Sequence, residues 1–284
     1  MTKSILITGS SGQVGHELSI AVSQHRLIPL SRQQLEITDP LQIEAAIENH
    51  CPDIMINAAA YTQVDRAEQE QSQAFAINRD GVADLAYACI KADIPLLHIS
   101  TNYVFDGSIQ GAYEEDGPIA PLGIYGKSKA SGEAILRTVL EKHIILRTSW
   151  VFSVTGNNFV KTMLHLGKER DQLEIVNDQR GCPTSARSIT QVLLNIADQY
   201  LSGAGVKWGT YHYCNQPETT WFEYAKEIFH QAGDYEKLRL RPITTNEYPT
   251  PAQRPKNSVL DCAKIEKEFG TQQASWIEEL KPLV

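Results

Sequence analysis

The sequence predicts an α/β protein with a Rossmann-like, doubly wound parallel sheet and a smaller α/β lobe. Three observations predict this fold. Short apolar segments alternate with helix-length segments in the first half, three glycines follow the first apolar segment, and the regular alternation ends near Phe152. Segments that are apolar at every position indicate strands buried on both faces, as in strand–helix–strand units. Ligands of such sheets bind at the carboxyl ends of the strands.

The expected strands are five segments of the first half of the chain, which read SILITG, RLIPLS, DIMINAAA, PLLHIS and HIILRTS. Residues 1–152 are therefore expected to form the first domain. In the second half the apolar segments are shorter and the loops longer, with helices expected at about 184–201, 220–232 and 261–269. Residues 153–284 are expected mainly in the smaller lobe, with some segments returning to the first domain.

Composition and charge exclude several classes of protein. With 284 residues, 42% apolar and 21% charged, the chain is typical of a globular enzyme. Its net charge of −8 argues against a nucleic-acid or anionic-membrane surface. The five cysteines contain no CxxC pair, which predicts reduced thiols in a cytoplasmic protein. The first apolar run is interrupted by Thr8 and Gly9, so no signal peptide is expected, and no later segment predicts a membrane span.

Three glycines lie where the first strand passes into the first helix. The segment ILITGSSGQVGHEL contains Gly9, Gly12 and Gly15. Gly9 can make the tight turn, Gly12 lets the backbone approach a pyrophosphate, and Gly15 permits close packing of helix on sheet. The amides and the positive dipole end of the helix favour phosphate. A plain strand-to-helix turn is the alternative, but the position favours a dinucleotide-binding domain in residues 1–152.

The end of the second strand distinguishes the two nicotinamide cofactors. An acidic residue there accepts the ribose hydroxyl of NAD, whereas an arginine meets the 2′-phosphate of NADP. Here the strand ends with Ser31 and Arg32, and the first acid is Glu36. The sequence therefore favours NADPH, with NADH as the alternative cofactor. A second alternative is that Arg32 is only a solvated charge at the end of the strand and binds no cofactor.

A tyrosine and a lysine lie four residues apart in the segment YGKSKASGE. Tyr125 and Lys129 share one face of a helix, whereas Lys127 points elsewhere and is expected to be a surface charge. A nearby ammonium favours the phenolate, so Lys129 is expected to lower the pKa of Tyr125 and improve it as a proton donor. Ser100 and Thr101 end the fourth strand and are expected to bring a hydroxyl beside a substrate carbonyl. A chance spacing is the alternative.

With these residues in place, the chain resembles the extended short-chain dehydrogenases/reductases, and among them the dTDP-4-dehydrorhamnose reductases. The matching segments run in order along nearly the whole chain and read GSSGQVGHEL, DIMINAAAYTQVDRAE, HISTNYVFDG, APLGIYGKSKASGE, LRTSWVF, GNNFVKTML, VNDQRGCPT and YPTPAQRPKNSVLD. The resemblance implies NADPH-dependent reduction of the C4 keto group of a nucleotide-linked 4-keto-6-deoxy sugar. The implied product is dTDP-rhamnose, a precursor in deoxysugar, surface polysaccharide and lipopolysaccharide biosynthesis.

Two alternatives stay open. The substrate could be another nucleotide-linked 4-keto sugar, or the chain could be a cofactor-binding regulatory subunit resembling the β subunit of methionine adenosyltransferase. A damaged Tyr–Lys pair would favour the regulatory subunit, and here Tyr125 and Lys129 are both present.

The resemblance implies a catalytic set of Thr101, Tyr125 and Lys129, in which Tyr125 donates the proton and Lys129 also holds the nicotinamide ribose. Motifs and resemblance together predict these cofactor contacts: Gly9, Ser11, Gly12, Gln13, Val14, Gly15, Ser31, Arg32, Glu36, Ile37, Ala58, Ala59, Ala60, Tyr125 and Lys129. The implied substrate contacts are Thr101, Asn102, Val104, Trp150, Asn158, Lys161 and Arg254.

The implied substrate site combines an aromatic face with local cations in the smaller, substrate-binding lobe. Trp150 is expected to pack on the sugar, and Asn158, Lys161 and Arg254 to bind the diphosphate. Three of them have a structural alternative: Trp150 could lie in the core, Lys161 could be an exposed helix residue, and Arg254 could be a loop charge. Asn102 stands where the family usually has Asp, which removes a charge from the substrate contact. Glu36 likewise stands where members commonly have Asp.

Some members of the family dimerise through a magnesium ion held by acidic side chains. Glu17 occupies one such position, but Arg187 occupies another and would repel a cation. The sequence therefore predicts no bridging metal and a monomer or weak homodimer. Glu17 is then expected to be an acid in the first turn of its helix, where it complements the helix dipole.

Overall fold

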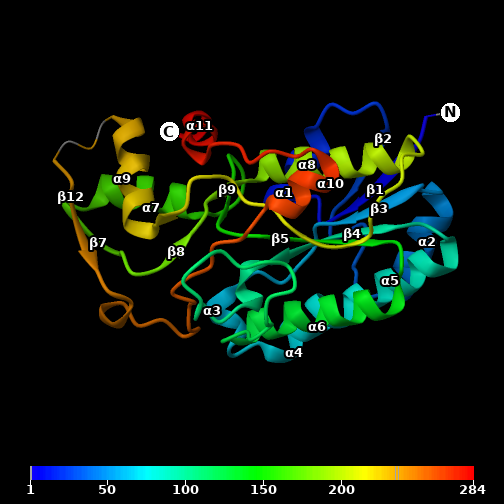
Figure 1. Cartoon of the computed structure of the whole chain (residues 1–284), viewed down its shortest axis with the longest axis horizontal. Coiled ribbons are helices and arrows are strands. Elements are labelled where there is room, and N and C mark those ends of the chain that lie inside the picture. The colour runs from blue at the N-terminus through cyan, green and yellow to red at the C-terminus, as the bar shows by residue number, and fades with distance from the viewer. Residues whose placement is uncertain (1, 234, 236) are drawn as a thin grey trace.

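A computed structural model describes residues 2–233, 235 and 237–284 of the chain. Its largest element is a six-stranded parallel sheet in the order β10-β5-β4-β3-β1-β2 (Figure 1). The strands are β1 (Ser4–Thr8), β2 (Arg26–Leu30), β3 (Ile54–Asn57), β4 (Leu96–Thr101), β5 (His143–Thr148) and β10 (Gly209–His212). The five strands predicted from the first half are all present, and the second half adds β10.

The direction of the strand order reverses at β1. β1 pairs with β2 on one side and with β3 on the other. Beyond β3 the sheet continues with β4 and then β5. In an open parallel sheet such a reversal opens a crevice at the carboxyl ends of the strands, where ligands bind. The glycine turn after β1 and the Ala58–Ala60 segment after β3 both lie at this crevice.

Helices cover both faces of the sheet (Figure 1). One face carries α1 (Gln13–Ile20), α8 (Ala186–Leu201) and α10 (Ala263–Phe269), and the other carries α2 (Pro40–His50), α5 (Gly81–Ala92) and α6 (Ile124–Val139). The strand side chains alternate between the two layers: Ile5 and Ile7 join the first core, and Leu6 joins the second. The predicted doubly wound α/β fold is therefore confirmed.

A second core organises the smaller lobe. Its parallel pair is β7 (Gln172–Val176) and β12 (Arg239–Ile243), packed with α7 (Phe159–Glu169), α9 (Trp221–Ala232) and α11 (Trp276–Leu280). Two short pairs join the lobe to the sheet: β6 (Val151–Phe152) with β9 (Thr184–Ser185), and β8 (Arg180–Gly181) with β11 (Thr219–Thr220). In Figure 1 this lobe lies to the left of the sheet, whereas β10, α8 and α10 lie with the sheet itself.

Short helical turns complete the described chain: α3 (Val64–Ala67), α4 (Gln71–Phe75), η1 (Ala76–Asp80), η2 (Asn102–Val104), η3 (Thr245–Glu247) and η4 (Lys281–Leu283). Among the helices described, none is both long enough and apolar enough to cross a lipid bilayer.

Candidate active site

The three glycines after β1 differ in what a side chain at each position would contact. Gly9 has a φ of +69°, and a Cβ there would lie 2.6 Å from the amide nitrogen of Ala59. A Cβ on Gly15 would lie 2.1 Å from the carbonyl oxygen of Gly9, so helix and turn could not pack as they do. A Cβ on Gly12 would meet only that same oxygen, at an ordinary 3.4 Å. The fold therefore requires Gly9 and Gly15, whereas Gly12 keeps surface open that the chain itself does not fill.

A groove of about 160 Å³ lies beside this turn, at the carboxyl ends of β1, β2 and β3. It is lined by Gly9, Ser11, Gly12, Arg32, Leu35, Glu36, Ile37, Ala58, Ala59, Ala60 and Ile77. All but Leu35 and Ile77 were predicted as cofactor contacts. The wall of glycine and alanine is low, and α1 begins after Gly12, which has no side chain to cap the helix amides. These features fit a flat dinucleotide with its phosphates at the helix N-terminus.

The other predicted cofactor residues near the turn do not line this groove. Val14 is buried in the core, and Gly15 packs on the turn. The Gln13 side chain accepts a hydrogen bond from Asn158 Nδ2 at 3.0 Å. Ser31 donates from its amide and its hydroxyl to Gln34 Oε1, at 2.9 and 2.8 Å.

Arg32 extends from the end of β2 beside the groove. Its side chain is 68% exposed, and its Nε donates to Glu36 Oε2 at 2.6 Å. Burial opposes ionisation of Glu36, but the hydrogen bonds from Arg32 and Thr38 hold the pKa of this carboxyl below its usual value. An exposed guanidinium on a short surface ion pair is free to turn toward an added phosphate, because such pairs contribute little stability.

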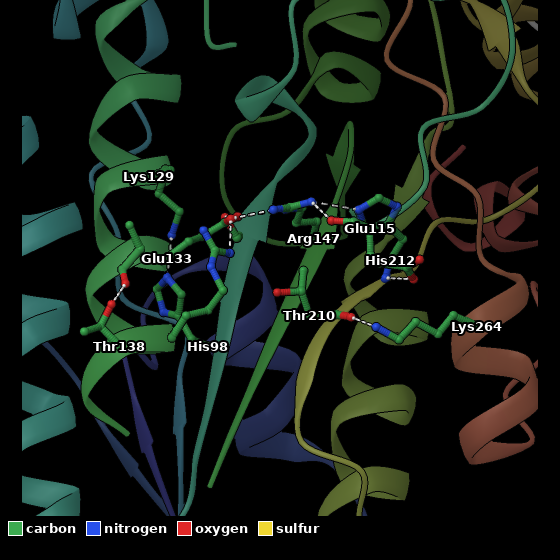
Figure 2. A network of polar contacts seen from close by, with 12 residues as sticks. His98, Glu115, Lys129, Glu133, Thr138, Arg147, Thr210, His212 and Lys264 are labelled. Atoms are coloured by element: carbon green, nitrogen blue, oxygen red, sulfur yellow. Dashed lines mark hydrogen bonds and ion pairs between the residues drawn. The ribbon is translucent and has the colours of Figure 1, made fainter. Parts of the chain in front are cut away.

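Tyr125 and Lys129 lie in the first two turns of α6, which begins after Gly123. The first amide of the helix, at Ile124, donates to Glu68 Oε1 at 2.8 Å, so a carboxylate from outside the helix caps its N-terminus. Lys129 is buried, whereas Lys127 is exposed, as predicted. Lys129 Nζ donates to the carbonyl oxygen of Ile99 at 2.7 Å and lies 3.2 Å from His98 Nε2 (Figure 2).

The predicted effect of Lys129 on Tyr125 is wrong for the free protein. Burial raises the pKa of Tyr125 to about 12, against an opposing hydrogen bond with Thr101. Burial also lowers the pKa of Lys129 to about 8, which Glu133 opposes. The reason is geometric: the lysine amine is directed to β4, where a carbonyl oxygen and a histidine hold it. Tyr125 is therefore fully protonated at neutral pH.

The two hydroxyls at the end of β4 point to different places. Thr101 Oγ1 accepts from the amide of Tyr103 and donates to Asn102 Oδ1, both at 3.2 Å. Ser100 Oγ instead donates to Glu133 Oε1 at 2.5 Å, beneath α6. The expectation that Ser100 contributes a hydroxyl beside the substrate is therefore wrong, because neighbouring residues of a strand face opposite sides.

The residues that follow Thr101 also differ from one another. Asn102 is almost fully buried, and its Nδ2 has no hydrogen-bond partner among the residues that the structure describes. A buried amide donor without a partner is costly, so a ligand oxygen near Thr101 would find a donor ready. Val104 has no exposed surface and packs in the core, and its carbonyl accepts from Ala120. The prediction that the Val104 side chain contacts substrate is therefore wrong.

A buried ion pair links α6 to the sheet (Figure 2). Arg147 on β5 donates to both oxygens of Glu133, at 2.9 and 2.7 Å, and from Nη1 to the carbonyl oxygen of Glu115 at 3.0 Å. Burial opposes ionisation of Glu133, but Arg147 and Ser100 hold the pKa of the carboxyl below its usual value. His212 lies 3.2 Å from Arg147, and burial together with that cation lowers the pKa of His212 to about 3. The helix that carries Tyr125 and Lys129 is thus fixed to β4 and β5.

A larger cleft of about 720 Å³ opens toward the smaller lobe. Its aromatic lining residues are Tyr103, Phe159, Trp221 and Tyr248, and its charged ones are Asp65, Arg170, Glu174 and Arg254. The Tyr103 ring and the Tyr125 ring meet edge to face, with centroids 5.7 Å apart, so one wall of the cleft packs against the tyrosine of α6. A large cleft with apolar walls and few charges is suited to a sugar nucleotide.

Arg254 is the predicted substrate cation that lines this cleft. Its Nη1 and Nη2 donate to the two oxygens of Asp65, at 2.6 and 2.8 Å. Lys161 is exposed and donates to the carbonyl oxygen of Gly156 at 3.1 Å. Asn158 caps α7 and donates to Ser153 and Gln13. Neither Lys161 nor Asn158 lines the cleft, so the structure does not bring the three predicted diphosphate contacts together.

Trp150 has an unusual backbone and a stacked partner. Its φ of +45° lies in the left-handed region, which a bulky side chain rarely adopts. Its ring stacks on Trp221, with centroids 3.6 Å apart and an interplanar angle of 12°. Gly181 leaves the room for this ring, because a Cβ there would lie 2.6 Å from it. Trp221 lines the cleft and Trp150 lies behind it. Trp150 was predicted from the sequence, whereas Trp221 was not.

Glu17 and Arg187 lie on α1 and α8, which pack against each other. Glu17 is the fifth residue of α1 and therefore lies in its second turn. The interpretation of Glu17 as a first-turn acid is wrong, because the helix begins at Gln13 and not later.

Comparisons with known proteins agree with this geometry. The family described as RmlD substrate binding domain matches residues 2–284. A protein of Aggregatibacter actinomycetemcomitans named dTDP-4-dehydrorhamnose reductase is 45% identical over 284 residues, which cover 98% of this chain and 97% of the relative.

Two solved structures are similar along the whole chain. A dTDP-4-dehydrorhamnose reductase from Clostridium acetobutylicum is 37% identical with a TM-score of 0.92, covering 99% of this chain and 98% of that one. A dTDP-4-dehydrorhamnose reductase from Bacillus anthracis, solved in complex with NADP, is 36% identical with a TM-score of 0.92, covering 100% and 99%.

Proposed function

The chain belongs to the RmlD substrate binding domain family, and from this premise we propose that it is a dTDP-4-dehydrorhamnose reductase, an NADPH-dependent oxidoreductase of dTDP-rhamnose biosynthesis. One observation carries the proposal. Tyr125, protonated and part-buried, meets Tyr103, which lines the cleft of about 720 Å³, and packs in one cluster with Ile77, which lines the glycine- and alanine-lined groove. A proton donor between a cofactor groove and a substrate cleft is what reduction of a carbonyl requires.

The groove residues would hold the dinucleotide. Gly12 and the first amides of α1 would meet the pyrophosphate, Arg32 would meet the 2′-phosphate, and Ala58–Ala60 would form the flat wall. Lys129 would hold the nicotinamide ribose. When bound, the nicotinamide supplies the hydride. NADPH is preferred because Arg32, and no acid, lies at the end of β2.

Tyr125 donates the proton to the substrate oxygen. With a pKa of about 12 its phenol is protonated at any working pH, so it is always able to donate a proton. Thr101 and Asn102 orient the carbonyl. The buried Nδ2 of Asn102, which lacks a partner within the described chain, would gain one in the substrate oxygens.

The cleft and the smaller lobe, mainly residues 153–284, receive the nucleotide sugar. Arg254 would bind the diphosphate with Lys161 and Asn158 at its margin, and the stacked Trp150–Trp221 pair would offer an aromatic face to the sugar or the base. We place the enzyme in the cytoplasm as a monomer or weak homodimer without a bridging metal.

The test is turnover with a panel of nucleotide-linked 4-keto sugars, each with NADPH and NADH. We expect oxidation of NADPH with dTDP-4-dehydrorhamnose and much slower turnover with the other sugars. A protein that binds NADPH and turns over none of them would overturn the proposal. Faster turnover of another sugar would retain the chemistry and change the substrate.

A further inference from the structure

A line of buried side chains runs beneath the active site from β1 to α6. Thr8 Oγ1 donates to Asn57 Oδ1 at 2.6 Å, and Asn57 Nδ2 lies 3.0 Å from His98 Nδ1. His98 Nε2 in turn lies 3.2 Å from Lys129 Nζ (Figure 2). Thr8, Asn57 and His98 have no exposed surface, and Lys129 has 2%. The line therefore joins the strand before the glycine turn to the catalytic helix without contact with solvent.

The backbone fixes which atom of Asn57 faces which neighbour. The amide of Ala59 donates to Asn57 Oδ1 at 3.0 Å, and a backbone N–H can only donate. The oxygen of Asn57 therefore faces Ala59 and Thr8, and its NH₂ group faces His98. Because an NH₂ group only donates here, His98 Nδ1 must be the unprotonated, accepting nitrogen.

A neutral histidine whose Nδ1 accepts carries its proton on Nε2. That N–H points at Lys129 Nζ, which can accept it only as an unprotonated amine. If Lys129 were a charged ammonium, its N–H group and the Nε2–H of His98 would face each other as two donors without an acceptor. Doubly protonated His98 is also disfavoured, because its second N–H would meet the NH₂ group of Asn57, and burial with Lys129 and His143 nearby lowers the pKa of His98 well below its usual value.

We propose that His98 is a positioning residue for the reduction: held by Asn57 as the Nε2–H tautomer, it donates a hydrogen bond to Lys129 and stabilises the unprotonated amine. This inference rests on the proposed function for its catalytic meaning, but the tautomer itself does not. A lysine whose ammonium and amine forms are close in free energy can exchange a proton with groups of the active site once cofactor and substrate are bound. Proton exchange is most effective when the group titrates near the working pH.

The remaining groups around Lys129 do not cancel this effect. Glu133, one turn further along α6, favours the ammonium, but Arg147 and Arg137 pair with that carboxylate. From β4 the ammonium is supported by the carbonyl oxygen of Ile99. On β5, His143 lies close enough to disfavour a charge on His98.

Long-range ¹H–¹⁵N correlation spectra of protein labelled on histidine read the tautomer directly and need no turnover. The chain has eight histidines, and the signals lost in His98→Gln, or in His98→Asn if the first variant fails to fold, belong to His98. We expect the neutral Nε2–H tautomer from about pH 5 to about pH 9, a range that spans the usual histidine titration. A protonated Nδ1 or an imidazolium would overturn the inference even if the enzyme is an active reductase.

The pH profile of kcat/KM for NADPH tests the catalytic meaning. Activity that needs the Lys129 ammonium falls as pH rises through its pKa, which is about 8 in the free protein. In His98→Gln, whose amide oxygen can accept from the ammonium, this limb should move up by about one pH unit, the effect of losing one opposing donor. His143→Gln is the control, because His143 is also buried but contacts Leu140 and not Lys129. An unmoved limb in His98→Gln, or an equal shift in the control, would contradict the proposal.

Discussion

Asp65 and Arg254 form a bidentate ion pair at the larger cleft, with N–O distances of 2.6 and 2.8 Å, although they lie 189 positions apart in the chain. Asp65 also accepts from the amide of Ala252 at 3.1 Å, so it holds both the guanidinium and the loop that carries it. The hydrogen bond from Arg254 is the main reason that the pKa of Asp65 lies below its usual value. The pair fixes the position of the guanidinium that we propose to bind the diphosphate.

Asp65→Asn should raise KM for the nucleotide sugar by about 10- to 100-fold with little change in kcat, because a charge-assisted bond of about 1.5–3 kcal/mol is lost. Steady-state kinetics measure this. Asp93→Asn is the control, since Asp93 pairs with Lys142 on the surface and asparagine tolerates its left-handed backbone. An unchanged or lower KM in Asp65→Asn would mean that Asp65 competes with the substrate for Arg254.

The glycines of the turn should separate folding from cofactor binding. Gly15→Ala places a Cβ 2.1 Å from a backbone oxygen and is expected to unfold at much lower urea concentration. Gly12→Ala meets only an ordinary contact and should lose about 1 kcal/mol of stability, while its NADPH affinity should fall at least about tenfold because the methyl group occupies phosphate-facing surface. Urea unfolding and fluorescence titration with NADPH measure the two effects. Equal loss of stability in both variants would contradict this division of roles.

Arg32 should set the preference between the two cofactors. Arg32→Ala removes a charge-assisted contact to a 2′-phosphate, so KM for NADPH should rise by about 10- to 100-fold while KM for NADH stays the same. Folding should be unaffected, because the surface pair with Glu36 contributes at most about 1 kcal/mol. Parallel kinetics with NADPH and NADH check this, and a proportional rise with both cofactors would exclude Arg32 as the 2′-phosphate contact.

The buried pair of Glu133 and Arg147 should dominate the acid sensitivity of the fold. Glu133→Gln leaves Arg147 as an uncompensated buried charge and should cost about 3–5 kcal/mol in urea unfolding. Arg137→Ala removes only the part-exposed partner of Glu133 and should cost less than about 1 kcal/mol. Similar losses in the two variants would contradict the central position of Arg147.

The pH dependence of this stabilisation has a definite sign. The folded-state pKa of Glu133 lies below its unfolded value of 4.5, so its contribution is complete above pH 4.5 and is lost as pH falls through the folded pKa. Glu133→Gln should therefore lose less stability than the wild type when both are acidified below pH 4.5.

Much of the fold could be predicted because buried parallel strands carry apolar residues at every position. β10 was not predicted as a strand of the sheet, since its four residues GTYH lie at an edge and carry no such run. The cofactor groove was predictable for the same reason as the sheet. Glycines and alanines that follow β1 and β3 must meet at the same edge of a parallel sheet.

The errors have identifiable causes. Ser100 and Thr101 were grouped together, although the alternation of a strand sends neighbouring side chains to opposite faces and could have separated them. The raised pKa of Tyr125 could not be foreseen from helix spacing, because it comes from burial of the phenol. The Lys129 amine that was expected to lower it is held on β4 by His98 and Ile99. Asp65 and Trp221 were missed because their partners, Arg254 and Trp150, lie far away in the chain.

Oxidation of NADPH by dTDP-4-dehydrorhamnose, compared between wild type and Tyr125→Phe, tests whether Tyr125 donates the proton in this reduction. Phenylalanine keeps the ring that meets Tyr103 and removes only the proton donor. We expect turnover in the wild type, and in Tyr125→Phe a kcat lower by about 10²- to 10⁴-fold with unchanged NADPH affinity. Full activity in a Tyr125→Phe protein that binds NADPH normally would contradict it.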